Sequence, residues 1–188
     1  MLAEQINTFR EMVTLKDGAY ILLRALTHED KNRLKEFYGA VTDDDLRYFR
    51  HQLKDDTVID DWCDHLDYNR VLPIIALAKE RVVGSATLHF FDGPKRHIGE
   101  VRLFLSKDFR KRGLGMKMIR SLIELARKHG VSILMAEVIA SMSKVVKAFE
   151  QQGFRPQVTL DDFFMFPDGD VCDVVLMTMA LRPRVDEF

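Results

Sequence analysis

The stretch that most constrains the fold is residues 110–115, Arg-Lys-Arg-Gly-Leu-Gly, between an apolar run at 101–105 and a helical pattern at 114–129. Glycine lets the backbone approach a bulky anion and adopt turns that other residues avoid. A helix that follows such a loop points its first N–H groups and the positive end of its dipole at the same anion. The three basic residues add positive charge. The pattern therefore predicts a strand, a phosphate-binding loop and a helix in succession.

Two common nucleotide-binding loops do not fit this stretch. A Walker loop requires a Lys-Ser or Lys-Thr pair, and none follows Gly115. The dinucleotide loop Gly-x-Gly-x-x-Gly lacks its third glycine, because Met118 stands at that position. The expected phosphate ligand is therefore of another kind.

Residues 110–115 do match the pattern Arg/Gln-x-x-Gly-x-Gly/Ala, the acyl-CoA pyrophosphate loop of the GCN5-related N-acetyltransferase (GNAT) superfamily. The chain resembles that superfamily over residues 18–154, where a second strand–helix unit ends in Gly153-Phe154. The resemblance implies an α+β fold with a mixed, mostly antiparallel sheet, a splayed parallel pair of central strands and flanking helices. It also implies transfer of an acetyl group from acetyl-CoA, the co-substrate, to a primary amine.

Length and composition fit a single domain over residues 1–188. With 47% hydrophobic and 30% charged residues, the chain can bury a sizeable core, and we expect a cytoplasmic protein. The net charge of −1 gives no basic field for nucleic acid. The polar segment 1–10 does not read as a signal peptide, and no apolar run is long enough for a membrane span. Cys63 and Cys172 form no Cys-x-x-Cys pair, which favours a reduced compartment without a thiolate metal site.

Hydrophobic periodicity and turn residues predict the other elements. Thr27 and Asp30 have the spacing of a capping box and open a helix that ends at Gly39. The predicted strands are 19–24, 72–78, 82–91, 98–106 and 131–138, the predicted helices 114–129 and 141–152, and a C-terminal hairpin covers 159–180. The strand at 131–138 is expected to lie parallel to the strand at 98–106, through a right-handed crossover.

Thr42 and Asp45 open a second helix in the same way, with Leu46, Phe49 and Leu53 at apolar positions. Aspartates are concentrated in and after this helix: 43, 44, 45, 55, 56, 60, 61, 64 and 67. They have two interpretations, either helix caps and a solvated face or a negative rim that attracts a cationic amine. In the family that the chain resembles, this region shapes the acceptor side.

The family resemblance also assigns cofactor contacts. The strand before the loop separates from the next parallel strand, and its exposed backbone at Leu103, Phe104 and Leu105 pairs with the pantetheine arm of CoA. Backbone N–H groups there would polarise the thioester carbonyl. The simpler interpretation of these three residues is a buried strand, and both interpretations can hold together. The remaining assigned contacts are Arg110, Lys111, Arg112, Gly113, Leu114, Gly115 and Met116.

Glu100 lies near the start of this strand, at about the place where family members that use a carboxylate have their general base. An amine acceptor arrives as an ammonium ion, since lysine has a pKa of about 10.4. A partly buried glutamate can accept that proton directly or through water. The alternative is a glutamate paired with Arg102 at the surface. His89 and His97 are further candidates for the base.

The chain departs from the family at two positions. The tyrosine that commonly acts as general acid is replaced by Phe149, and a common asparagine seven residues earlier is Met142. Ser143, or a water that it holds, is a possible substitute for the acid. No metal site is expected, because the spacing of the one cluster considered matches no recognised ligand set: His51, Asp55 and His65.

Residues 22–30, 66–70 and 84–86 look most like the catalytic domain of bacterial protein lysine acetyltransferases. This resemblance implies a protein lysine as the acceptor. Two alternatives stay open, namely a small amine such as an amino acid or polyamine, and a CoA-binding sensor without turnover. The identity of the acceptor and the oligomeric state do not follow from the sequence.

Overall fold

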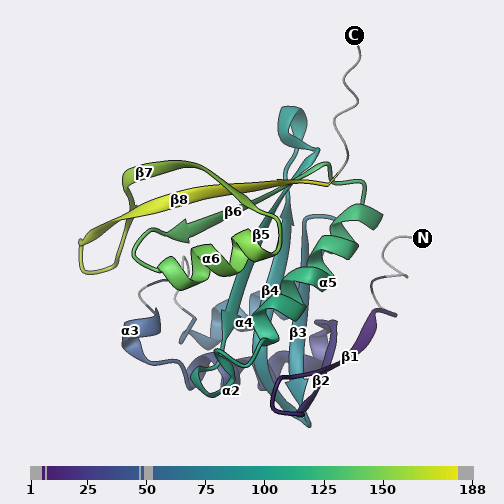
Figure 1. The fold of residues 1–188 in the computed structure, drawn as a ribbon. Coiled ribbons are helices and arrows are strands. Elements are labelled where there is room, and N and C mark those ends of the chain that lie inside the picture. The colour runs from purple at the N-terminus through teal and green to yellow at the C-terminus, as the bar shows by residue number, and fades with distance from the viewer. Residues whose placement is uncertain (1–5, 7, 47, 49–52, 182–188) are drawn as a thin grey trace.

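Eight strands form one open sheet (Figure 1). The computed structural model describes residues 6, 8–46, 48 and 53–181. The strands are β1 (Arg10–Thr14), β2 (Tyr20–Ala25), β3 (Val71–Ala78), β4 (Arg81–Phe90), β5 (Ile98–Leu105), β6 (Ile133–Ile139), β7 (Arg155–Met165) and β8 (Val171–Ala180). Their order is β1-β2-β3-β4-β5-β6-β8-β7, and all neighbours are antiparallel except β5 and β6, which are parallel. The predicted α+β fold is confirmed.

Helices cover both faces of this sheet. They are α2 (Lys31–Gly39), α3 (Asp43–Leu46), α4 (Asp56–Asp64), α5 (Leu114–Lys128) and α6 (Ser143–Gln151). One hydrophobic core lies between the sheet and α5 and α6, and a second lies between the sheet and α2 and α4 (Figure 1). Within the described residues, no helix is both long enough and apolar enough to cross a membrane.

The helix α5 forms where the sequence predicts it. Leu114, Met118 and Leu122 recur at intervals of four residues and are fully buried against the sheet. This spacing places them on one stripe of an α-helix. The buried stripe fixes the N-terminal end of α5 next to β5, so the loop at 110–115 lies at the C-terminal end of β5.

The parallel strands β5 and β6 separate part-way along their length. Their pairing runs from Ile98 opposite Ile133 to Glu100 opposite Met135. Beyond this point β5 continues to Leu105, and β6 continues in register with β8. Within the described chain, the second half of β5 therefore has no partner in β6, and the splayed pair implied by the family resemblance is present.

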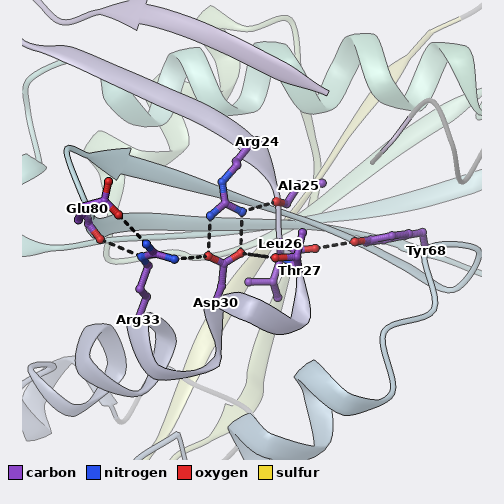
Figure 2. Close-up of polar contacts among 8 residues, drawn as sticks. All are labelled: Arg24, Ala25, Leu26, Thr27, Asp30, Arg33, Tyr68 and Glu80. Atoms are coloured by element: carbon purple, nitrogen blue, oxygen red, sulfur yellow. Dashed lines mark hydrogen bonds and ion pairs between the residues drawn. The ribbon is translucent and has the colours of Figure 1, made fainter. Parts of the chain in front are cut away.

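The connection between β2 and α2 is fixed by a buried ion pair (Figure 2). Asp30 is fully buried, and its carboxylate accepts hydrogen bonds from both terminal nitrogens of Arg24, at 2.5 and 2.6 Å. It also accepts the backbone N–H of Thr27 at 3.0 Å, which completes the predicted capping box. Arg33 links Asp30 to Glu80 in the turn between β3 and β4. The network holds the start of α2 against the sheet.

Tyr68 extends this network towards β3. Its hydroxyl donates a hydrogen bond to the carbonyl of Leu26 at 2.6 Å (Figure 2). The segments 22–30 and 66–70, which carry much of the resemblance to protein lysine acetyltransferases, are therefore in direct contact. The hydrogen bond ties the chain that leads into β3 to the connection between β2 and α2.

Two parts of the N-terminal half differ from the sequence prediction. The strand β1 was not predicted, and it lies beside α5, where Ser121 donates a hydrogen bond to Glu11 at 2.7 Å. The second predicted helix does not extend to Leu53, which is buried in a turn between α3 and α4. Phe49, expected on the same helix, lies outside the described residues.

The strands β7 and β8 form the predicted hairpin, and β7 is one outer edge of the sheet. Their pairing shifts register between Leu160 and Phe164, so the intervening residues form a bulge. Within the bulge, Asp162 has a φ of 50°, and its N–H donates to the carboxylate of Asp173 in β8 at 3.0 Å. The bulge therefore turns the N–H of Asp162 towards β8.

Candidate active site

The splayed half of β5 presents backbone groups at an open edge. Along a strand, the N–H and C=O groups of successive residues point alternately to its two edges. Ser106 donates its N–H to Val83 of β4 at 3.0 Å. The groups of Leu103 and Leu105 therefore point away from β4, towards the splay, whereas those of Phe104 point to β4. Of the three residues predicted to pair with pantetheine, the geometry exposes the backbone of Leu103 and the N–H of Leu105, whose carbonyl accepts a hydrogen bond from Nε of Arg110 at 3.1 Å.

The N-terminus of α5 supplies N–H groups beside this edge. Lys117 donates its N–H to the carbonyl of Gly113 at 3.3 Å, which closes the first turn. The N–H groups of Leu114, Gly115 and Met116 precede that turn and have no acceptor within the helix. No described side chain caps this end of α5. Such an end binds anions, so the geometry fits a phosphate group at the predicted residues.

The two loop glycines meet different requirements. Gly113 has a φ of 89°, which other residues rarely adopt. A Cβ there would lie 3.6 Å from the Lys16 side chain, an ordinary contact, so protein packing alone does not exclude a side chain. At Gly115, a Cβ would lie 3.1 Å from Leu103 and 3.3 Å from Leu105. This second glycine therefore allows α5 to pack closely on β5.

The arginines of the loop are engaged by acidic residues. Arg112 pairs with Asp17 at 2.5 Å, and Arg110 pairs with Asp45 at 3.0 Å. Lys111 has a φ of 61° and an exposed side chain. Of the three basic residues predicted to contact the cofactor, Lys111 is the one whose side chain is exposed.

The sequence alone did not predict that further basic residues lie beside the N-terminal end of α5. A shallow pocket of about 280 Å³ adjoins the first turns of α5 and the turn between β1 and β2. Its lining residues are Thr14, Leu15, Lys16, Gly113, Met116, Lys117 and Arg120. Three of these are basic, so positive charge is denser here than the loop sequence suggests. Lys16 could not be placed beside the loop without knowledge of the β1–β2 hairpin.

Glu100 is buried, with 4% of its surface exposed, at the last position where β5 pairs with β6. Arg102 donates two hydrogen bonds to its carboxylate, at 2.8 and 3.0 Å. The ion pair considered as an alternative is therefore present, but it is not a surface pair. His89 lies directly opposite Glu100 on β4, and its Nε2 lies 2.9 Å from the hydroxyl of Thr87. His97, in contrast, is exposed and precedes β5.

Alternation along β5 places Glu100, Arg102 and Phe104 on the same face of the sheet. The ring of Phe104 packs against Phe37 and Tyr38 of α2, with centroid distances of 5.7 and 6.4 Å. The carboxylate therefore lies on the α2 face, whereas α5 lies on the opposite face. The open edge of β5 lies between the two faces, so a group bound along it would be accessible from the Glu100 side.

The structure shows no matched acid at the position where the family has a tyrosine. Phe149 is a core residue, whose ring meets that of Phe154 edge to face at 5.1 Å.

Burial raises the pKa of Tyr38 to about 12, against the opposing effect of a hydrogen bond with Ser85. A phenol this weak is poorly matched to a thiol leaving group of pKa about 8.5. Ser143 is exposed at the start of α6.

Many of the aspartates between residues 42 and 67 have partners within the protein. Lys31 of α2 pairs with Asp64 of α4 at 2.7 Å, and Lys35 pairs with Asp60 at 2.8 Å. Asp45 contacts Arg110, and Asp55 caps α4. Asp56 pairs with Lys35, Asp61 pairs with His65, and Asp67 closes a turn. These contacts support the interpretation as caps and a paired helix face.

No group of His, Cys, Asp and Glu side chains in the described parts of the chain could hold a metal ion. His51, one member of the cluster considered in the sequence, lies outside those parts.

A splayed parallel strand pair, an open strand edge and a glycine at the N-terminus of α5 are the features that the resemblance to the GNAT superfamily implies. Residues 34–154 match the acetyltransferase (GNAT) family, and the chain belongs to that family. It is therefore an acetyltransferase.

Solved structures share this fold. The GNAT domain of PAT from S. lividans has a TM-score of 0.75 and 20% identity, with 91% of this chain and 96% of that chain covered. The chimeric spermidine N-acetyltransferase from Vibrio cholerae and hSSAT has a TM-score of 0.71 and 16% identity, covering 86% and 95%. The yncA structure from Salmonella typhimurium, which contains acetyl-CoA, has a TM-score of 0.71 and 15% identity, covering 88% and 96%. At these identities the likeness concerns the fold.

Proposed function

We propose that this protein transfers an acetyl group from acetyl-CoA to a primary amine, with Glu100 as the proton acceptor. One observation carries the proposal: the pairing of β5 with β6 ends at Glu100, which leaves the backbone of Leu103 and the N–H of Leu105 open next to a buried carboxylate. Membership of the family and the fold likeness to a structure that contains acetyl-CoA support the choice of co-substrate.

The residues of β5 and α5 divide the binding of the co-substrate between them. The backbone groups of Leu103 and the N–H of Leu105 would pair with pantetheine and polarise the thioester carbonyl. The N–H groups of Leu114, Gly115 and Met116 would hold the pyrophosphate, with Lys111 adding charge at the rim. Acetyl-CoA would supply the thioester whose carbonyl carbon the amine attacks.

In the reaction, the acceptor ammonium gives one proton to Glu100. The amine nitrogen then forms a bond to the acetyl carbon, and the bond from that carbon to sulfur breaks. The nitrogen loses its second proton as the amide forms, and the departing thiolate takes up that proton to become the thiol of CoA. A thiol with a pKa of about 8.5 is a fair leaving group without a dedicated acid, which is compatible with Phe149. Arg102 compensates the charge of the buried carboxylate before the ammonium arrives.

We propose a protein lysine as the first acceptor to test. The support is the resemblance of residues 22–30 and 66–70 to bacterial protein lysine acetyltransferases, together with the fold shared with PAT. A small amine is the second candidate, since the fold is also that of a spermidine acetyltransferase.

The test is release of free CoA thiol from acetyl-CoA, measured with lysine-bearing proteins, polyamines and amino acids as separate acceptors. Release that depends on one acceptor class supports the proposal and identifies the class. Calorimetric binding of acetyl-CoA without release in any arm would instead favour a sensor that has lost turnover.

A further inference from the structure

We propose that Arg110 and Asp45 are positioning residues that couple occupation of the acetyl-CoA site to the ordering of α3. The inference rests on the proposed acetyl-CoA site, but it gives the Arg110 side chain a role other than a phosphate ligand. All three guanidinium nitrogens are bonded to protein groups. Nε donates to the carbonyl of Leu105 at 3.1 Å, and the two terminal nitrogens donate to the two oxygens of Asp45 at 3.2 and 3.0 Å.

On one side, this contact fixes the open end of β5. The carbonyl of Leu105 points towards the splay, where the pantetheine arm is proposed to lie. The guanidinium carbon of Arg110 also lies 5.4 Å from the centroid of the Phe104 ring. Arg110 therefore holds the last two residues of β5, one through its backbone and the other through its side chain.

On the other side, the contact fixes α3. Asp45 is only 15% exposed, and it also lies near Lys107 (3.7 Å) and the hydroxyl of Thr42 (3.3 Å). Burial acts to raise the pKa of Asp45, but the hydrogen bonds and charge of Arg110, with the charge of Lys107, outweigh it, so that the pKa lies below its ordinary value. Asp45 is therefore ionised at neutral pH, and its pair with Arg110 is a charge-assisted, two-bond contact.

The pair thus joins two regions with different tasks. The end of β5 belongs to the proposed acetyl-CoA site, whereas Phe104 contacts α2 on the face that carries Glu100. A ligand that orders the β5 end also orders Arg110 and, through it, Asp45 of α3. Coupling of this kind is reciprocal, so fixing α3 must strengthen acetyl-CoA binding by the same factor.

Hydrogen exchange with CoA as the probe tests this coupling. In the wild type, CoA should slow amide exchange both in residues 106–118 and in residues 41–46. In Asp45→Asn, which keeps the size of the side chain, CoA should still protect 106–118 but no longer 41–46. Its affinity for CoA, measured by calorimetry, should fall about fivefold or more. Asp44→Asn is the matched control, because Asp44 is an exposed residue of the same helix, and its exchange pattern should follow the wild type.

A double-mutant cycle separates positioning from direct phosphate binding. If the pair acts as a unit, Arg110→Gln and Asp45→Asn should each weaken CoA binding, and the double variant should be little worse than either. Arg110→Lys, which keeps the charge but loses the two-bond geometry, should resemble Arg110→Gln. Additive effects, or a loss confined to the Arg110 variants, would overturn the inference in favour of a direct ligand.

The result also distinguishes this inference from the proposed function. Wild-type protein that fails to bind CoA would overturn the acetyl-CoA site itself. Normal CoA binding with the same exchange in residues 41–46 for the wild type and Asp45→Asn would overturn only the coupling.

Discussion

The guanidinium of Arg102 donates two hydrogen bonds to the buried carboxylate of Glu100, two positions away on the same face of β5. The arginine holds the carboxylate in one orientation and compensates its charge. If Glu100 is the proton acceptor, as proposed, an acceptor ammonium approaches a base that already has a cationic partner, and the two cations compete for the same oxygens.

Glu100→Gln should retain CoA binding and lose most turnover at pH 7. The substitution keeps the size of the side chain but removes its ability to accept a proton, and a positioned base contributes about a hundredfold to ten-thousandfold. Residual activity should rise with pH towards the amine's own pKa, because the reaction then depends on acceptor that is already deprotonated. Initial rates from pH 7 to pH 10, alongside calorimetry with CoA, would measure both effects.

His89→Gln is the matched control for this experiment, since His89 lies opposite Glu100 on the same face. It should retain most activity if the glutamate is the base. A Glu100→Gln rate close to that of the wild type, with a large loss in His89→Gln, would transfer the role to the histidine.

Gly113→Ala and Gly113→Asn separate backbone strain from obstruction of the phosphate. Alanine at a φ of 89° should destabilise the fold by about 1–3 kcal/mol. Asparagine tolerates this conformation better, so its free energy of unfolding should be closer to that of the wild type. Both should lose CoA affinity if the phosphate needs a bare backbone there. Unchanged affinity in the stable Asn variant would argue against a phosphate at Gly113.

Asp30→Asn should destabilise the protein strongly, by about 3 kcal/mol, because it leaves Arg24 without its buried partner. Glu80→Gln, at the exposed end of the same network, should have little effect. Denaturant unfolding of the two variants would compare them directly. Near-equal stability of both would contradict the structural role of the buried pair.

The contribution of Asp30 should also depend on pH. Burial opposes its ionisation, but hydrogen bonds from Arg24 and Thr27 outweigh this, so the pKa of Asp30 is below its ordinary value. A carboxyl whose pKa is lowered on folding stabilises the protein above its unfolded pKa of about 3.9. The stability difference between wild type and Asp30→Asn should be constant near neutral pH and shrink as the pH falls below about 4 towards the folded-state pKa.

Neutralising Asp60 and Asp64 together should lower the unfolding midpoint slightly and leave acceptor kinetics unchanged. Both residues pair with lysines of α2, so their charge is already compensated within the protein. Steady-state rates at several salt concentrations would check this. A higher KM for the amine, with a flatter dependence on salt, would support electrostatic attraction of the acceptor instead.

Much of the fold was predictable because its central elements carry strong local signals. The stripe of Leu114, Met118 and Leu122 defines α5, and the Thr27–Asp30 capping box defines the start of the α2 segment. The strand β1 had no such signal, since Val13 is its one buried residue and its position depends on pairing with β2. Local patterns cannot reveal a strand that a neighbouring strand stabilises.

The candidate site was predictable in part for the same reason. Glycines and an adjacent helix N-terminus are local features, so the loop at 110–115 could be recognised. The partners of its arginines could not, because Asp17 and Asp45 are distant in sequence. Glu100 could be named, but its burial and the position of His89 across from it depend on the register between β4 and β5.

The bulge in β7 has a consequence for protein at high concentration. A straight, exposed outer strand acts as a template on which further strands can add, and fibrous aggregates grow in this way. In β7, Asp161 and Asp162 place negative charge at the outer rim, and the N–H of Asp162 is already bonded to Asp173. An incoming strand would meet a break in register and like charges from an identical copy. We therefore expect the bulge to limit edge-to-edge association between copies of the protein.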